Sequence, residues 1–228
     1  MEITLERLIG KRKPTHEEIL DFAESHPADA TFGMIKPLAV DEHGVEGAMS
    51  IVRKAVRREG FTIILWKAGE VGRDYVAEHY LVHKGNPESP EWLHEELQNR
   101  MGGRKVVRFI VVGHDALNVM REKHAQFTNA ILMGILNPEA IRWHLTAKKV
   151  REEFAHSFAD ADKKFDWKVR QKPKEELEKE ITAKMDEEIY KLAGIENGVH
   201  FSKPGETVNG KAANLHEIWA FLNDLGKK

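Results

Sequence analysis

Cysteine is absent from this chain of 228 residues, so disulfide bonds and thiolate metal sites are excluded. Long apolar runs are absent as well, and none approaches the ~20 residues that span a bilayer. The N-terminal sequence MEITLERLIGKRKP intersperses charge among its apolar residues and lacks the apolar core of a secretion signal. We therefore expect a cytoplasmic protein with no membrane partner.

An excess of one charge sign is also missing, because 35 Lys and Arg residues face 37 Asp and Glu residues, for a formal charge of -2. Such a chain has no global field to attract nucleic acid. Its 17 glycines form no G-x-x-x-x-G-K-[S/T] phosphate loop. His79 and His83 stand four residues apart but lack the glutamate of an H-E-x-x-H metal motif. The sequence thus predicts no nucleic-acid partner and no metal held by the protein itself.

Four segments have the apolar, β-branched composition of strands: residues 31–35, 61–68, 106–112 and 198–201. Helical spacing or helix-end signals predict helices at residues 44–59, 74–80, 87–101, 115–123 and 212–225. Asp115 is expected to cap the helix that follows it. This order predicts an α+β fold, a ferredoxin-like βαββαβ sandwich with a four-stranded antiparallel sheet covered by helices.

Two segments stand outside that plan. Residues 1–28 predict an N-terminal helical extension, with a helix around Pro14 to Ser25 that Thr15 could cap. Residues 29–228 form the main domain. Within it, the Lys- and Glu-rich stretch at about 159–193 contains several opposite charges spaced four apart, which predicts an exposed inserted helix.

Five short motifs follow one another along the chain, and their order adds to the information that each one carries. They are Thr31-Phe32-Gly33-Met34-Ile35-Lys36-Pro37, Glu78-His79-Tyr80, Val150-Arg151-Glu152-Glu153-Phe154, Asn197-Gly198-Val199-His200-Phe201-Ser202 and Glu217-Ile218-Trp219. In this order and context they resemble the nucleoside diphosphate kinase family, with the resemblance running from about Thr31 to Leu222. The main domain is thereby similar to a nucleoside diphosphate kinase domain with an extension and an insertion.

The resemblance implies a phosphotransferase that moves the terminal phosphate of a nucleoside triphosphate to a nucleoside diphosphate through a phosphohistidine. It gives the nucleophile's role to His200, with Glu217 acting through Ser202 to fix the imidazole tautomer. The nucleotide-binding residues it implies are Lys36, Tyr80, Arg151 and Asn197, with Trp92 as the candidate for base stacking. It further implies ATP and other nucleotides as partners, Mg²⁺ brought with the nucleotide, and a homo-oligomer.

The chain also departs from the family pattern. Leu38 and Ala39 replace an acidic residue and a glycine, and Leu136 replaces a threonine. A phosphate-binding arginine of the family aligns with Ala130 or, across a gap, with the neighbourhood of Arg121, Lys123 and His124. These losses keep a second hypothesis open, a catalytically weak or inactive nucleotide-binding or scaffold protein on the same fold. A third is an interaction module built around the inserted helix.

Overall fold

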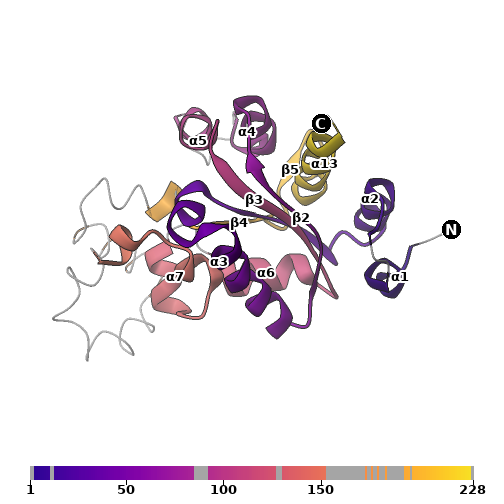
Figure 1. Cartoon of the computed structure of the whole chain (residues 1–228), viewed down its shortest axis with the longest axis horizontal. Helices are drawn as coiled ribbons and strands as arrows, with labels where there is room; N and C mark the ends of the chain where they lie inside the picture. The colour runs from indigo at the N-terminus through magenta and orange to yellow at the C-terminus, as the bar shows by residue number, and fades with distance from the viewer. Residues whose placement is uncertain are drawn as a thin grey trace.

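The computed structural model describes residues 3–10, 13–84, 92–126, 130–152, 193–195 and 197–226, with Pro173, Glu176, Lys179 and Ala183. These residues form a four-stranded antiparallel sheet in the order β2-β3-β1-β4, with helices on both faces (Figure 1). The strands are β1 (Ala30–Ile35), β2 (Thr62–Glu70), β3 (Lys105–Val112) and β4 (Val199–Phe201). The predicted βαββαβ fold class is therefore confirmed.

The two central strands are buried on both sides, which explains their continuous apolar sequences. All six residues of β1 are buried, as are seven of the eight in β3. Gly33 in β1 lies between Phe109 of β3 and Phe201 of β4, and an added Cβ would lie 2.4 Å from the Phe109 ring. Because Gly33 has no side chain, the two phenylalanine rings meet across β1 with centroids 5.7 Å apart. This contact packs the short strand β4 against the sheet.

One face of the sheet is covered by helices from both ends of the chain and by two helices from its middle (Figure 1). They are α1 (Leu5–Gly10), α2 (His16–Ser25), α4 (Arg73–His79), α5 (Leu93–Met101) and α13 (Ala213–Gly226). The turn η1 (Leu81–His83) follows α4. On this face Arg108 of β3 is fully buried and donates a 2.8 Å hydrogen bond to Asp224 of α13. This ion pair ties α13 to the sheet.

The opposite face carries α3 (Pro37–Arg58), α6 (Ala116–Ala125) and α8 (Ile141–His144). The helix α3 begins seven residues before the predicted start, because Pro37 occupies its first turn, where a missing N–H costs nothing. Gly44, the start predicted from the sequence, has the non-helical angles φ 66° and ψ 165° and divides this element into two helical stretches. The second stretch follows the glycine as predicted, whereas the first, from Pro37, was not predicted.

The N-terminal helices add to the core. As predicted, Thr15 caps α2: its hydroxyl accepts from the Glu18 N–H at 3.2 Å, and the Glu18 carboxylate accepts from the Thr15 N–H at 2.9 Å. The side chains of Leu8 and Phe22 are buried in the same cluster as residues of β1 and α13. The division at residue 28 stays a prediction.

Three local details differ from the sequence-based expectations. Asp115 does not cap α6, since it adopts a left-handed conformation (φ 60°) and its carboxylate accepts from the Asn118 side chain instead. The helices α7 (Ala130–Leu136) and α8 were not predicted, because their short apolar sequences lack a helical period. The expected turn-rich loop after residue 201 contains a small hairpin, β5 (Thr207–Val208) and β6 (Lys211–Ala212).

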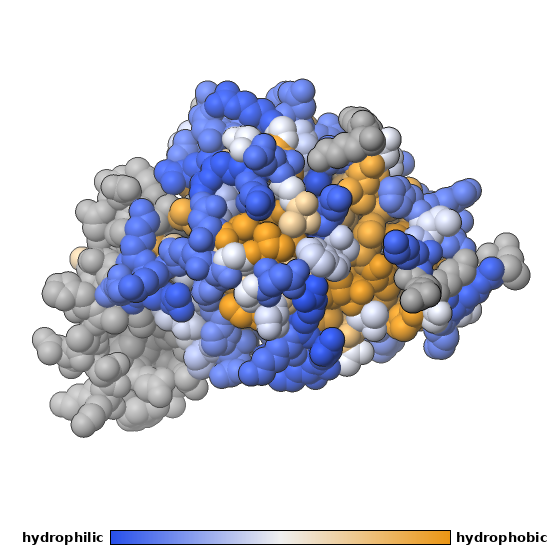
Figure 2. Space-filling view, viewed as in Figure 1, coloured by the Kyte–Doolittle hydropathy of each residue, from blue (hydrophilic) through white to orange (hydrophobic). Residues whose placement is uncertain are grey.

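The predicted helix at about 159–193 lies almost entirely outside the described residues. Among the helices that are described, none combines the length and apolar character needed to cross a bilayer. In the view of Figure 2, apolar surface gathers in the middle of the molecule, where Figure 1 shows the strands, and hydrophilic surface lies on the helices around it. Strand β2, at one edge of the sheet, carries Trp66 with 38 % of its surface exposed.

Candidate active site

Strand β4 places His200 at the other edge of the sheet. His200 lies opposite Met34 of β1, and the strand is fixed at both ends by bonds from Lys36 N–H to Gly198 O (2.9 Å) and from Ser202 N–H to Phe32 O (3.2 Å). The strand is entered through Gly198, whose φ of 76° suits glycine. An added Cβ there would also lie 2.5 Å from the backbone of Leu145. The glycine therefore sets where the histidine strand starts.

The three residues predicted as catalytic come together. Nε2 of His200 lies 2.8 Å from Oε1 of Glu217, and the Ser202 hydroxyl donates to Oε2 of the same carboxylate. Glu217 comes from α13 and is buried with 3 % exposure, whereas the His200 side chain is 16 % exposed. The contact assigns the proton of neutral His200 to Nε2, so Nδ1 carries the available lone pair.

Burial controls the ionisation of this group. It holds the pKa of His200 well below its usual value, and the nearby positive charges of Lys36, Arg121 and Arg142 lower it further. Burial also raises the pKa of Glu217, although His79 and the hydrogen bond from Ser202 act in the opposite direction. At neutral pH the imidazole is therefore uncharged, as a nucleophile must be.

Two aromatic residues of the predicted histidine–tyrosine pair lie against His200. The Tyr80 ring centroid is 5.5 Å from that of His200, and the His79 ring is 5.1 Å away. His79 is fully buried and also lies 4.9 Å from the Phe32 ring. His79 was not among the predicted site residues, yet the structure brings it beside both His200 and Glu217.

Lys36 and Asn197 approach the same strand. Lys36, at the end of β1, is 5 % exposed, and its ammonium donates to the backbone carbonyl of Ile195. Asn197, just before β4, is 2 % exposed and donates from Nδ2 to Gly194 O at 2.8 Å. Asn197 thus belongs to the segment that leads into the histidine strand, and Lys36 contacts that segment from the end of β1.

Two arginines near His200 were not among the predicted site residues. Arg142 of α8 donates to Val199 O through Nε (3.1 Å) and Nη2 (2.9 Å), and Arg121 of α6 donates to Phe201 O at 3.2 Å. They bind the carbonyl groups on either side of His200, at the outer edge of β4. Arg121 lies in the sequence neighbourhood where a family arginine could align across a gap. Arg142 gave no sequence signal.

The other candidates for that arginine are engaged elsewhere or carry no charge. Lys123 pairs with Glu59 at 2.6 Å, and Nε2 of buried His124 lies 3.4 Å from the same carboxylate. Ala130 is completely buried in α7. Of the described cations in this neighbourhood, Arg121 is therefore the one placed beside His200.

Two predicted binding residues are not joined to His200 by any described contact. Arg151 lies at the end of a described stretch, and its positive charge lowers the pKa of His43. Trp92 precedes α5 and is 50 % exposed. Their nucleotide-binding roles stay predictions. Of the departures, Leu38 and Ala39 lie in the first turn of α3, and the side chain of Leu136 lies outside the described part of the chain.

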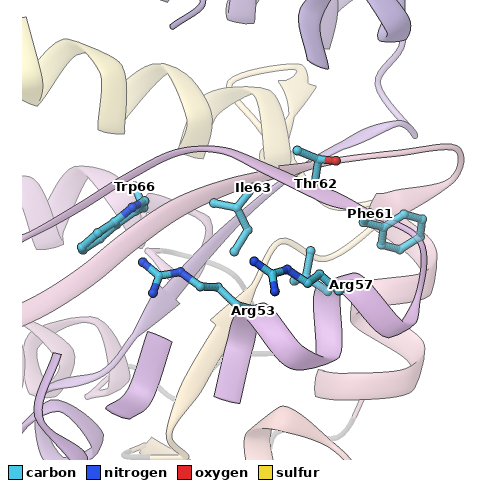
Figure 3. Close-up of a pocket in the computed structure, with 7 residues that line it drawn as sticks. Arg53, Arg57, Phe61, Thr62, Ile63 and Trp66 are labelled. Atoms are coloured by element: carbon cyan, nitrogen blue, oxygen red, sulfur yellow. The ribbon is translucent and has the colours of Figure 1, made fainter. Parts of the chain in front are cut away.

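A separate pocket of about 260 Å³ opens between α3 and β2 (Figure 3). Arg53, Arg57 and Trp66 line it, and the Arg53 guanidinium lies 5.2 Å from the centre of the Trp66 ring. None of the predicted site residues lines this pocket. The chemistry described above belongs to the β4 edge instead.

Comparison with known proteins agrees with this architecture. A family model described as nucleoside diphosphate kinase matches residues 29–166, which is more than half of the chain. The match ends before β4, so the roles of His200 and Glu217 rest on the geometry given above. A search of curated protein sequences finds no match.

Solved structures show the fold. The chain superposes on the nucleoside diphosphate kinase of Aquifex aeolicus with a TM-score of 0.52 and 18% identity, covering 85% of this chain and 94% of that one. The Borrelia burgdorferi enzyme, solved with vanadate and ADP as a transition-state mimic, superposes with a TM-score of 0.51 and 17% identity, covering 84% of this chain and 85% of that one. The Halobacterium salinarum enzyme in complex with CDP superposes with a TM-score of 0.50 and 18% identity, covering 85% of this chain and 87% of that one. Together with the family match, they show that this chain belongs to the nucleoside diphosphate kinase family, a family of nucleotide phosphotransferases.

Proposed function

We propose that this chain moves the terminal phosphate of a nucleoside triphosphate to a nucleoside diphosphate through a phosphohistidine at Nδ1 of His200. The observation that carries the proposal is the hydrogen-bonded series from Ser202 through Glu217 to His200. It occupies one ring nitrogen and leaves the other, on a partly exposed side chain, available to a substrate. A packing histidine has no need of a buried carboxylate held by a second side chain.

The reaction divides into two displacements. The Nδ1 lone pair forms a bond to the terminal phosphorus, while the bond from that phosphorus to the bridging oxygen breaks and its electron pair leaves with the diphosphate. An acceptor diphosphate then attacks the phosphohistidine and takes the phosphoryl group. Positive charge develops on the imidazole in the first step, and the Nε2–H bond to the Glu217 carboxylate stabilises it.

Charge on the phosphates is neutralised by fixed cations. Arg121 and Lys36 approach His200 from opposite sides of β4, the former from α6 and the latter from the end of β1. We assign both to phosphate binding, and Tyr80 to the wall of the same space. Arg142 already donates to both Val199 O and Ala125 O, so we assign it to holding β4 in place.

Mg²⁺ fits this site only when it is bound to the phosphates of the nucleotide. The carboxylate nearest to His200 is that of Glu217, and its two oxygens already accept from His200 and Ser202. Mg²⁺ prefers oxygen ligands and is commonly held through substrate phosphates and water. When bound in that way, it supplies additional charge neutralisation at the phosphates.

The test is incubation of the purified chain with γ-labelled ATP, followed by addition of GDP. We expect acid-labile, base-stable label on the protein that moves to GDP and disappears in His200→Ala. His83→Phe is the matched control, because it removes a neighbouring, half-buried histidine but keeps an aromatic ring against Tyr80. Label that persists in His200→Ala excludes His200 as the carrier.

The weak or inactive nucleotide-binding protein remains the second candidate. It is favoured by Ala130, which is buried and uncharged where the aligned family residue is an arginine. Thermal stabilisation of the chain by ATP without any labelled protein would establish this alternative.

We also propose a cytoplasmic homo-oligomer. The lack of cysteine supports a reducing compartment. Self-association is supported by the edge strand β2, which pairs with β3 on one side and exposes Trp66.

A further inference from the structure

His79 is a polar side chain in an unusual position. It is fully buried, and neither of its ring nitrogens has a hydrogen-bond partner among the described residues. Buried polar atoms in native proteins almost always have a hydrogen-bond partner, so two ring nitrogens without one need a physical explanation. Aromatic packing against Phe32 and Tyr80 accounts for the ring but not for the choice of histidine over phenylalanine.

Nε2 of His79 lies beside other potential metal ligands. One ligand atom each from His79, His200 and Glu217 lie within 4.8 Å of one another. Oε1 of Glu217 is 2.8 Å from Nε2 of His200 and 3.9 Å from Nε2 of His79. Ligand atoms around a tetrahedral Zn²⁺ at about 2.1 Å are about 3.4 Å apart, which lies between these two distances. Because the remaining separation, between the two histidine ligand atoms, is within 4.8 Å, side-chain shifts on the order of 1 Å would complete the site.

We propose that His79, His200 and Glu217 form an inhibitory binding site for Zn²⁺ or a similar transition-metal ion. Two imidazoles and one carboxylate are the ligand set of several zinc sites, whereas Mg²⁺ prefers oxygen alone. The fourth position is left for water. The partly exposed side chain of His200 gives the ion a route from solvent.

The state of the ligands favours binding at neutral pH. Burial lowers the pKa of His79 to about 3, so this imidazole is uncharged and loses no proton to the metal. His200 is neutral as well, with its single ring proton on Nε2 facing Glu217 in the free protein. When the metal binds the lone pair of Nε2, this proton is carried by Nδ1 instead, and the imidazole stays neutral.

Inhibition follows from this change of tautomer and rests on the proposed function of His200. In the free protein, the carboxylate of Glu217 faces the Nε2–H group and leaves the Nδ1 lone pair available. With the metal on Nε2, Nδ1 carries the ring proton and has no lone pair to attack phosphorus. Phosphoenzyme formation is then slowed.

The experiment uses the full chain and two probes, Co²⁺ and Zn²⁺. One equivalent of Co²⁺ is expected to give the visible absorption of a four-coordinate ion, which Zn²⁺ abolishes and excess Mg²⁺ does not. The key variant is His79→Phe, which keeps the aromatic contacts and removes the ligand, and His83→Phe is its control. His79→Phe should lose the Co²⁺ spectrum and raise the Zn²⁺ concentration for half-inhibition by about 10-fold or more.

The outcomes separate this inference from the proposed function. No Co²⁺ spectrum in the wild-type chain, or the same spectrum in His79→Phe, overturns the metal site. A His79-dependent spectrum in a chain that forms no labelled protein keeps the metal site and removes the kinase proposal. A His79-dependent spectrum without inhibition overturns the inhibitory role. Circular dichroism of His79→Phe verifies that the variant is folded.

Discussion

Glu217→Gln is the sharpest perturbation of the proposed mechanism, because it removes one charge and changes little in shape. The carboxylate accepts from Nε2 of His200 at 2.8 Å, and hydrogen bonds to charged groups contribute about 1.5–3 kcal/mol. If this contribution is made mainly when the imidazole becomes positive, the loss appears in the barrier. At about 1.4 kcal/mol per tenfold in rate, phosphoenzyme formation should slow by about 10- to 150-fold.

Stability should move differently from rate. Burial raises the pKa of Glu217, which means that the fold disfavours its ionised form. A neutral glutamine at this position is therefore expected to leave the free energy of unfolding unchanged or higher. Rapid-quench measurement of single-turnover labelling by γ-labelled ATP gives the rate, and urea unfolding gives the stability.

Ser202→Ala provides a graded companion. It removes the hydrogen bond to Oε2 of Glu217 but leaves the carboxylate against His200, so a smaller slowing of about 3- to 10-fold is expected. Labelling by Glu217→Gln at the wild-type rate would refute the assigned role of the carboxylate. A loss of rate that merely follows a loss of folded protein would refute it equally.

Three further outcomes are expected. Arg121→Gln should lower kcat/KM by about 10- to 150-fold, which corresponds to a loss of about 1.5–3 kcal/mol of transition-state stabilisation, because it removes a cation that we assign to phosphate binding. Steady-state kinetics with ATP and GDP measure this loss. Gly198→Ala should destabilise the fold by about 2–4 kcal/mol in urea, since its φ is 76° and its Cβ would meet the Leu145 backbone. Acidification should lower the free energy of unfolding. Burial lowers the pKa of His79 to about 3 and that of His124 to about 4 in the folded chain, against the ordinary value of 6.5. The unfolded chain therefore binds protons first as the pH falls. Between about pH 7 and about pH 5.5, urea unfolding should show a loss of about 2 kcal/mol, reduced in His79→Phe.

Much of the secondary structure could be predicted from local patterns in the sequence. The strand at residues 106–112 and the capped helix α2 were predictable because composition and capping act over a few residues. The helical stretch after Gly44 was predicted, but the stretch from Pro37 to the kink was missed because it is too short to show a helical period. The short α7 and α8 depend on tertiary packing and have no periodic pattern of their own.

The candidate site was predictable where a motif names its residues together, and less so where the fold alone brings them together. Asn197, His200 and Ser202 stand in one segment, so the resemblance found all three. Arg142 is 57 positions away from Val199 in the sequence, and no motif around Arg142 predicts that the two residues are in contact. The nearness of His79 to Glu217 likewise depends on α4 and α13 packing side by side.

The late position of β4 along the chain has a consequence for synthesis. Strands β1, β2 and β3 all precede residue 113, whereas the histidine strand and the carboxylate of Glu217 follow residue 198. A nascent chain can pair its first three strands while the place of β4 beside β1 is still empty. Until β4 leaves the ribosome, the growing polypeptide lacks His200 and exposes the backbone edge of β1. The proposed phosphotransfer therefore requires that both β4 and the later helix α13, which carries Glu217, have been made.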